Sequence, residues 1–280
     1  MRSQLLANRY QLNRHMQHVS EADYYAATDI ITTQPVTVRT IDISTLGAVG
    51  IGLEHLAKDK LRRKVENEAK IVERLRQLSH PNLLKILADG FENPIYYHIY
   101  PPFRFENLQT RMAQELPMME ALAYISQAAD VMAFLHRNGI VHCDISADNL
   151  VVIENKIKVI EFSIANFRPA EGNPGNPFYM SPESITGSAP KPARDVWALG
   201  VTLVYALTGE LPFGSFNMPM RDGVPLLFQA ILSTPPSLKT RHLPQQLNLM
   251  IHQMLEKDSD KRPGMQQVAE GLASVLKTAG

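Results

Sequence analysis

An aspartate and an asparagine stand five residues apart in one short segment of the chain, Ile140–Leu150. Asp144 supplies a carboxylate and Asn149 an amide, and side chains of these types accept protons or give oxygen ligands to a divalent cation. Aspartate and asparagine also favour capped turns, so a purely structural loop is the alternative interpretation of this pair. In either case, the segment lies between a predicted helix and a predicted hairpin.

The elements that hold this loop are predicted from hydrophobic periodicity, which is mainly helical in the second part of the chain. Three stretches have the pattern of amphipathic or buried helices: Glu120–His136, Asp195–Thr208 and, in two pieces, Leu243–Leu276. A predicted hairpin pairs Leu150–Ile153 with Ile157–Ile160 directly after the loop. The loop is therefore expected to have a helix before it and a hairpin after it.

The N-terminal part of the chain predicts a different architecture. Residues 9–57 are β-rich, and Gln34–Ile43 alternates with the period of a half-buried strand. Residues 58–79 then switch to a helical period, with an apolar stripe along one face. Leu83–Tyr100 is again strand-like, and turns are expected within it at Asp89-Gly90 and at Asn93-Pro94.

Composition excludes several classes of protein. The 28 Lys and Arg residues balance 28 Asp and Glu residues, which predicts no nucleic-acid partner. A single cysteine excludes an internal disulfide and favours a reducing, cytoplasmic setting. The start of the chain lacks the apolar core of a signal peptide. Its most apolar run, Trp197–Leu207, is shorter than the roughly 20 residues that span a bilayer, so no membrane segment is expected.

Further motifs follow the Asp144 loop in a fixed order. They are Glu161-Phe162-Ser163, Ser181-Pro182-Glu183 and Asp195-Val196-Trp197-Ala198-Leu199-Gly200. In this order and spacing, the loop and the three motifs resemble the HRD…N, DFG, APE and DxWxxG motifs of the protein kinase catalytic domain. Upstream, Glu68-Ala69 followed by Leu78–Asn82 is similar to the αC helix of that family and its exit.

The resemblance covers about residues 10–275 and implies one kinase-like domain over residues 1–280. The implied fold class is α+β and bilobal, with a small β-rich N-lobe at about 9–100 and a helical C-lobe at about 105–276. The hinge between them is expected at about 101–104, where Pro101-Pro102 stiffens the connection.

The resemblance also implies roles for individual residues. Asp144 matches the catalytic aspartate that accepts the proton of the substrate hydroxyl, and Asn149 and Glu161 match Mg²⁺ ligands. Arg39 stands at the strand lysine that binds the ATP phosphates. Glu68 lies in the apolar stripe of its helix, so an ion pair with Arg39 is expected, with a solvated Glu68 on a tilted helix as the alternative. ATP and Mg²⁺ are the cofactors so implied.

Other matching residues are architectural. Asp195 matches the residue that braces the backbone of the catalytic loop, and His142 and Phe162 match side chains packed beneath it. Glu183 and Arg262 match an ion pair that ties the APE turn to the late helices. These matches imply an intact C-terminal scaffold.

Positions that handle nucleotide or phosphate in the family are altered in this chain. They are the strand lysine (Arg39), the glycine-rich loop (His15–Tyr25, without glycine), DFG (Glu161-Phe162-Ser163), the catalytic-loop lysine (Ser146) and a threonine near APE (Asn176). Arginine keeps the charge but donates in a different geometry, and glutamate carries its carboxylate on a longer arm. The glycines at 47, 50 and 52 follow the Arg39 strand, so a flexible loop is predicted there.

Cys143 stands where the family has an arginine that pairs with a phosphorylated loop. The corresponding loop, residues 164–180, contains no Ser or Thr and only Tyr179 as a hydroxyl. We therefore expect no switching of this loop by Ser/Thr phosphorylation. Cys143 is interpreted as a small packed residue, with a reactive thiol as the alternative.

An intact scaffold under an altered nucleotide site predicts a pseudokinase that binds or regulates a partner protein. Retention of Asp144, Asn149 and Glu68 favours the alternative, a divergent Ser/Thr kinase that transfers the ATP γ-phosphate to a protein hydroxyl with Asp144 as base. A third hypothesis is a kinase fold that transfers a phosphate or nucleotide moiety to an acceptor other than protein.

Overall fold

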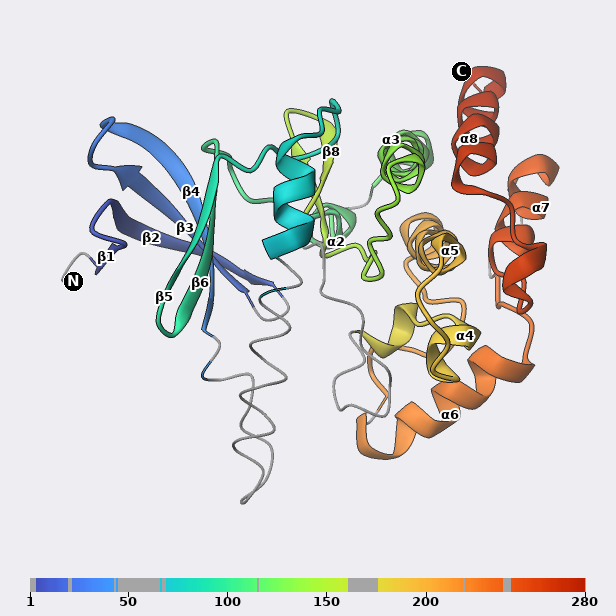
Figure 1. The fold of residues 1–280 in the computed structure, drawn as a ribbon. Helices are drawn as coiled ribbons and strands as arrows, with labels where there is room; N and C mark the ends of the chain where they lie inside the picture. Colours follow the sequence, from blue (N-terminus) through green and yellow to red (C-terminus); the bar gives the residue numbers. More distant parts are fainter. Residues whose placement is uncertain are drawn as a thin grey trace. The chain divides into compact units, whose positions relative to one another are not determined.

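The computed structural model describes residues 4–19, 22–42, 44, 66, 69–114, 116–160, 176–218, 220–238 and 243–279. The chain divides into two compact units, an N-terminal unit of residues 1–105 and a C-terminal unit of residues 106–280. The first is built on a β-sheet and the second mainly on helices, as Figure 1 shows. The α+β class expected from the sequence is confirmed.

Six antiparallel strands form the sheet of the N-terminal unit within the described residues, in the order β1-β2-β3-β4-β6-β5. They are β1 (Gln4–Leu6), β2 (Tyr10–Val19), β3 (Ala22–Asp29), β4 (Gln34–Asp42), β5 (Ala88–Glu92) and β6 (Ile95–Tyr100). Residues 69–76 are helical, inside the stretch for which a helix was predicted.

Strand β4 is buried on both faces. Val36 and Val38 join Ile99 in an apolar cluster with residues of β1, β2 and β3. On the opposite face, Thr37 is 1% and Arg39 is 3% exposed. The half-buried strand predicted for this stretch is therefore wrong in its burial, because strands flank β4 and side chains cover both of its faces.

The turn expected at Asp89-Gly90 is also wrong, since both residues lie within β5. Gly90 stands opposite Tyr97 of β6, and a Cβ atom at Gly90 would lie 2.3 Å from the Tyr97 hydroxyl oxygen. Because Gly90 has no side chain, the Tyr97 ring fits against it, and the strand continues through this position. The chain reverses at Asn93-Pro94, between β5 and β6, where the second turn was predicted.

The C-terminal unit contains one hairpin and several helices in the part that the structure describes. Its strands are β7 (Leu150–Ile153) and β8 (Lys156–Val159), and its longer helices are α3 (Met118–Arg137), α5 (Pro192–Thr208), α6 (Met220–Ser233), α7 (Gln245–Met254) and α8 (Met265–Ala279). Short helical turns are α2 (Leu108–Met112), η3 (Pro177–Tyr179), α4 (Pro182–Ile185) and η4 (Ser259–Lys261). The predicted hairpin and long helices are confirmed.

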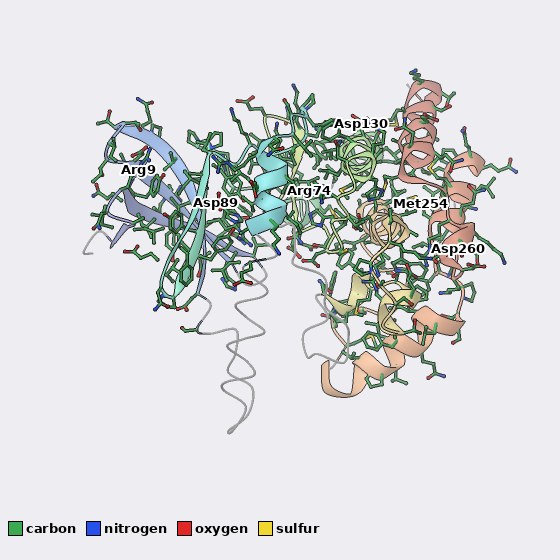
Figure 2. The ribbon with its side chains drawn as sticks, in the orientation of Figure 1. Arg9, Arg74, Asp89, Asp130, Met254 and Asp260 are labelled. Carbon is green, nitrogen blue, oxygen red and sulfur yellow. The ribbon has the colours of Figure 1, made fainter. Side chains whose placement is uncertain are left out.

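Helix α5 lies inside this unit, as its apolar sequence predicted. Trp197 is fully buried and stacks on Phe213, with ring centroids 5.4 Å apart. At Gly200, a Cβ atom would lie 3.1 Å from Cβ of Met254, so the glycine allows α7 to approach α5 closely. Figure 2 labels Met254 at this position among the packed side chains. No helix of the described residues is long and apolar enough to cross a bilayer.

Candidate functional site

One buried carboxylate, that of Asp195, accepts the hydrogen bonds that hold the backbone of the loop before the β7–β8 hairpin. Asp195 in the first turn of α5 is 0% exposed and accepts hydrogen bonds from the backbone N–H groups of His142 at 2.9 Å and Cys143 at 2.7 Å. His136 at the end of α3 lies 2.7 Å from the same carboxylate through Nε2. Cys143 has φ of 66°, a left-handed conformation that costs energy for a residue with a side chain. Asp195 thus stabilises a strained backbone at the start of the loop.

His142 supports the same loop from beneath. Its Nδ1 accepts the backbone N–H of Asp144 at 3.2 Å, so the ring proton sits on Nε2, which donates to the carbonyl oxygen of Ile160 at 2.9 Å. The side chain is fully buried. The imidazole therefore joins the loop to the end of the β7–β8 hairpin as a neutral bridge, and it is packed beneath the loop, as the resemblance implied.

Asp144 and Asn149 come together across the loop. The Asn149 amide donates to the carbonyl oxygen of Asp144 at 2.7 Å and to its carboxylate Oδ2 at 3.0 Å. The backbone of Asn149 is held in turn, since its N–H donates to Ser146 and its carbonyl accepts from Ile160. The Asn149 amide therefore closes the loop, which agrees with the interpretation of this pair as a structural turn.

The oxygen of the Asn149 side-chain amide has a different environment from the nitrogen. Asn149 is 1% exposed, and its Oδ1 is buried without a hydrogen-bond partner. An orphaned buried oxygen is costly, and amide oxygens are ligands that Mg²⁺ accepts. The residues present therefore fit a divalent cation at this end of the loop, where Asn149 Oδ1 would be one ligand. The described residues contain no cluster of three acidic, His or Cys ligands, so a cation would need further ligands from elsewhere.

The same loop carries a second carboxylate that the sequence did not single out, that of Asp148. Asp148 accepts a hydrogen bond from the side-chain amide of Asn107 at 3.2 Å, and burial raises the pKa of Asp148. Asn107 also caps α2, where its Oδ1 accepts the N–H of Thr110 at 2.9 Å. Burial, followed by the charge of Asp148, raises the pKa of the nearby Tyr179 hydroxyl. Tyr179 is 5% exposed, so the single hydroxyl of its loop is enclosed.

Cys143 behaves as a packed residue. Burial and the negative charge of Asp195 raise the pKa of its thiol well above the usual range, and the opposing charge of Arg194 does not offset them. The thiol is therefore neutral and a poor nucleophile. Of the two interpretations of Cys143, packing is supported and a reactive thiol is not.

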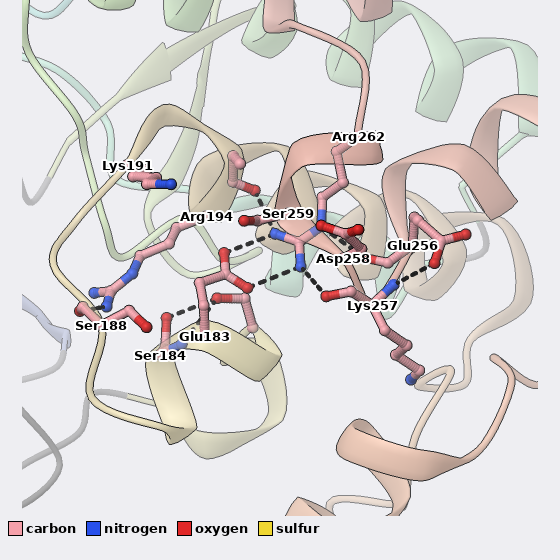
Figure 3. Close-up of polar contacts among 12 residues, drawn as sticks. Glu183, Ser184, Ser188, Lys191, Arg194, Glu256, Lys257, Asp258, Ser259 and Arg262 are labelled. Carbon is pink, nitrogen blue, oxygen red and sulfur yellow. Dashed lines mark hydrogen bonds and ion pairs between the residues drawn. The ribbon is translucent and has the colours of Figure 1, made fainter.

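The ion pair predicted between Glu183 and Arg262 is present and bidentate, with N–O distances of 2.7 and 2.8 Å (Figure 3). The Arg262 side chain is 0% exposed and also donates to the carbonyl oxygens of Ala193, Glu256 and Lys257. Burial alone would raise the pKa of Glu183, but the Arg262 guanidinium outweighs it and holds that pKa below its ordinary value. The pair joins α4, α5 and the turn after α7.

Arg39 belongs to the N-terminal unit and points into its interior. Tyr24 on β3, Arg39 on β4 and His98 on β6 stand opposite one another in the strand register. Nη1 of Arg39 lies 3.4 Å from Nδ1 of His98, which must be the acceptor because a guanidinium can only donate. Burial and the charge of Arg39 hold the pKa of His98 well below its usual range. A neutral imidazole thus faces the buried cation.

An aromatic cluster of Tyr24, Tyr100, Phe103 and Phe105 lies on the same face of the sheet. The Tyr24 ring is fully buried, 4.9 Å from the ring of Phe105 and 6.4 Å from that of Phe103. The Phe103 ring lies 6.4 Å from that of Tyr100. The backbone N–H of Phe103 donates to Thr37 Oγ1 at 3.3 Å. The end of the N-terminal unit is therefore packed and internally hydrogen-bonded.

Several predicted site residues lie outside the described residues. They are Glu68, Glu161, Phe162, Ser163 and the glycines at 47, 50 and 52. The Glu68–Arg39 ion pair and the Mg²⁺ role of Glu161 therefore stay predictions. His98 and Asn107 were missed, although the alternation of Ile95–Tyr100 places Tyr96, His98 and Tyr100 on one face and could have indicated the first.

Comparison with known families and proteins agrees with these motifs. A model of the protein kinase domain matches residues 51–271. Serine/threonine-protein kinase PrkC of Bacillus subtilis is 27% identical over 285 residues, which are 98% of this chain and 41% of that protein. Hormonally up-regulated neu tumor-associated kinase homolog A of Xenopus laevis is 28% identical over 269 residues, 92% of this chain and 36% of that protein.

A plant relative is similar at the same level. CBL-interacting protein kinase 5 of Oryza sativa subsp. japonica is 27% identical over 227 residues, 78% of this chain and 46% of that protein. The chain spans less than half the length of each of these three relatives.

Replacing Asp195 tests whether one carboxylate holds the loop. Asp195→Ala leaves two backbone N–H groups and His136 without their acceptor, so we expect the free energy of unfolding to fall by about 3 kcal/mol or more. Trp197 is the single tryptophan of the chain and lies in α5, so its fluorescence reports denaturant unfolding of the C-terminal unit. Asp260→Ala, which removes an 81% exposed carboxylate, is the control and should cost less than about 1 kcal/mol. Equal effects of the two variants would contradict this role.

The Glu183–Arg262 pair predicts a defined pH dependence. A carboxyl group whose folded pKa is lowered contributes stability above its unfolded pKa, about 4.3, and loses it as the pH falls through the folded value. Glu183→Gln should therefore be less stable than wild type at pH 7, by about 3 kcal/mol. The difference should shrink below pH ~4. Urea unfolding followed by Trp197 fluorescence across this range measures it, and a difference independent of pH would refute the assignment.

Proposed function

This chain belongs to the protein kinase domain family, and from that premise we propose that it is a pseudokinase. In this proposal the domain binds or regulates a partner protein, and transfer of phosphate from ATP is absent or very weak. The intact C-terminal scaffold serves as the binding module. The altered positions lie where the family handles nucleotide.

The observation that carries the proposal is the environment of Arg39. By resemblance this residue should reach the ATP phosphates, and phosphate binding needs a cation whose donors face the ligand. Arg39 is instead 3% exposed, opposite Tyr24 and His98, with the neutral His98 imidazole 3.4 Å from Nη1. A guanidinium placed in this way supports the packing of the sheet more directly than it supports nucleotide binding.

The end of the N-terminal unit supports the same proposal. Ligand sites combine an apolar wall with a few unoccupied polar groups. Here Pro101 and Pro102 have no backbone N–H, and the N–H of Phe103 is taken by Thr37. The rings of the aromatic cluster pack on one another and so take the place of an apolar wall that a ligand could contact.

A divergent active Ser/Thr kinase is the second candidate, and Asn149 favours it. Its buried, unpartnered Oδ1 suits a Mg²⁺ ligand, and its amide holds Asp144 within the loop. In this candidate Asp144 accepts the proton of a protein hydroxyl, Glu161 completes the Mg²⁺ site, and Arg39 and Glu68 contact or position the ATP phosphates. Transfer of phosphate or a nucleotide moiety to an acceptor other than protein would use the same loop.

The remaining expectations follow from the family and from composition. The names of all three relatives contain the word kinase, so a protein partner or substrate is proposed for this chain as well. We keep the cytoplasmic setting, and the expectation of no nucleic-acid partner, as proposals from the single cysteine and the balanced charge.

Nucleotide binding and transfer decide between the candidates. We expect millimolar ATP with Mg²⁺ or Mn²⁺ to leave the melting temperature unchanged relative to salt of matched ionic strength. A ligand present at 100 times its Kd would instead add about 2.7 kcal/mol of stability. We also expect no incorporation of γ-³²P phosphate that depends on Asp144. The matched control is Asp144→Asn, which keeps the size of the side chain and removes its charge. Incorporation by wild type that is lost in Asp144→Asn would reject the pseudokinase and support the active kinase.

A further inference from the structure

One lysine amine of the C-terminal unit lies against aromatic rings. Lys257, in the turn after α7, is half-buried, and its Nζ lies 4.0 Å from the ring centroid of Phe213 and 5.1 Å from that of Trp197. The same Nζ donates to the carbonyl oxygen of Ile231 at 2.6 Å. That carbonyl belongs to the last turn of α6, and the residue four positions later is Pro235, which has no N–H to donate. The amine is therefore held in one place by a hydrogen bond and two rings.

The charges around this amine do not compensate it. None of the ion pairs within the described part of the chain includes Lys257. The carboxylate of the preceding residue, Glu256, accepts the backbone N–H of Lys257 at 3.0 Å. The Arg262 guanidinium lies 5.0 Å from the centroid of the same Trp197 ring. Two cations therefore share one indole, and lysine is the one of the two that can lose its proton.

A lysine in this setting is a nucleophile. Burial, followed by the charge of Arg262, lowers the pKa of Lys257 to about 8, and the charge of Glu256 offsets this only in part. The ring faces attract the ammonium form, whereas burial and the second cation favour the neutral amine. At pH 7.5 roughly a quarter of an amine with this pKa is neutral, against about one part in a thousand for an ordinary lysine. The neutral form carries the lone pair that attacks an acyl carbon.

We propose that Lys257 is an acylation site, which takes a small uncharged acyl group such as acetyl from an acyl phosphate or an acyl thioester. The lone pair of Nζ forms the amide bond to the acyl carbon. The bond from that carbon to the phosphate oxygen or the thioester sulfur breaks, and the leaving group takes its electron pair and the proton that Nζ releases. This site does not depend on whether the domain binds ATP or transfers phosphate.

The surroundings of the amine favour an uncharged product. The amide is neutral and keeps one N–H, which can still donate to Ile231, while the repulsion between Lys257 and Arg262 disappears. An anionic adduct such as a carbamate would need a donor or a counter-charge. The nearby Arg262 is already occupied, because its N–H groups donate to Glu183 and to three backbone carbonyl oxygens. Acylation therefore fits this place better than carbamylation does.

Rates of modification test the site. The whole chain is incubated at pH 7.5 with millimolar acetyl phosphate or millimolar acetyl-CoA, and peptide mass spectrometry follows each lysine. Lys261, whose side chain is 70% exposed, is the internal reference. We expect acetylation at Lys257 to be about ten times faster than at Lys261, because the larger neutral share outweighs the lower basicity and the partial burial. The faster of the two donors identifies the source of the acyl group, and no preference for Lys257 with either donor would overturn the site.

The pH dependence of the rate separates a nucleophilic amine from a merely accessible one. The neutral share of Lys257 rises with pH until the pKa is passed, so acetylation there should level off above a pH of about 8. The charged groups that act on the amine are Arg262 and Glu256, and neither changes its charge between pH 7 and pH 10. Acetylation at Lys261 should keep rising through this range. Rates that rise in parallel at the two lysines would contradict the proposal.

Variants of nearby carboxylates test the electrostatic cause. Glu256→Gln keeps an acceptor for the backbone N–H of Lys257 and removes the charge that favours the ammonium form, so acetylation at pH 7.5 should be about twofold faster. Asp260→Asn removes an 81% exposed carboxylate and should leave the rate as in wild type. An unchanged or slower rate in Glu256→Gln would overturn the assignment, as would an equal gain in Asp260→Asn.

The fluorescence of Trp197, the single tryptophan of the chain, gives a second measurement. Acetylation replaces the cation over its ring with a neutral amide, so the emission intensity should change in proportion to the acetylated fraction of Lys257. Lys257→Arg keeps a cation and cannot be acetylated in this way, so its emission should not respond to the donor. An equal response in Lys257→Arg would overturn the proposal, as would constant emission from wild type acetylated at Lys257.

Discussion

The hydrogen bonds to the Asp195 carboxylate are the constraint on which the candidate site depends. A helix begins in the interior of the C-terminal unit, and its first-turn carboxylate accepts two consecutive backbone N–H groups from a loop more than 50 residues earlier. Cys143 can keep its left-handed backbone only because those bonds offset the strain. With that turn held, the following residues bring Asp144 and Asn149 within hydrogen-bonding distance. The geometry of the loop is thus set by hydrogen bonds within the C-terminal unit.

The two units treat buried charge in different ways. In the C-terminal unit, Glu183 and Arg262 form a bidentate pair whose remaining donors reach backbone carbonyls, so the charges are compensated. In the N-terminal unit, Arg39 lies between Tyr24 and His98 on neighbouring strands, and one of its contacts is a hydrogen bond from Nη1 to the neutral ring of His98. A sheet with a cation inside it gains packing and specificity from that arrangement.

Sequence alone predicted what depends on local repetition. The helices α3 and α5 and the β7–β8 hairpin follow from periodicity, and Asp144 and Asn149 were found together because five residues separate them. His98 could not be anticipated as the partner of Arg39, because 59 residues separate the two and only the strand register places them opposite each other. The turn predicted at Gly90 was wrong for a similar reason, since a glycine that makes room for a facing ring looks the same in the sequence as a glycine in a turn. Glu68 and Glu161 lie outside the described residues, so their roles stay predictions.

The hydrogen bonds of the loop have a consequence for the evolutionary history that this domain can have. Those of His142, Cys143 and Asn149 described above all end on residues of the C-terminal unit, including Asp195 and Ile160. Substitutions in the sheet of the other unit therefore leave these particular hydrogen bonds in place. A lineage could therefore exchange residues of the sheet while these hydrogen bonds keep the loop in one shape.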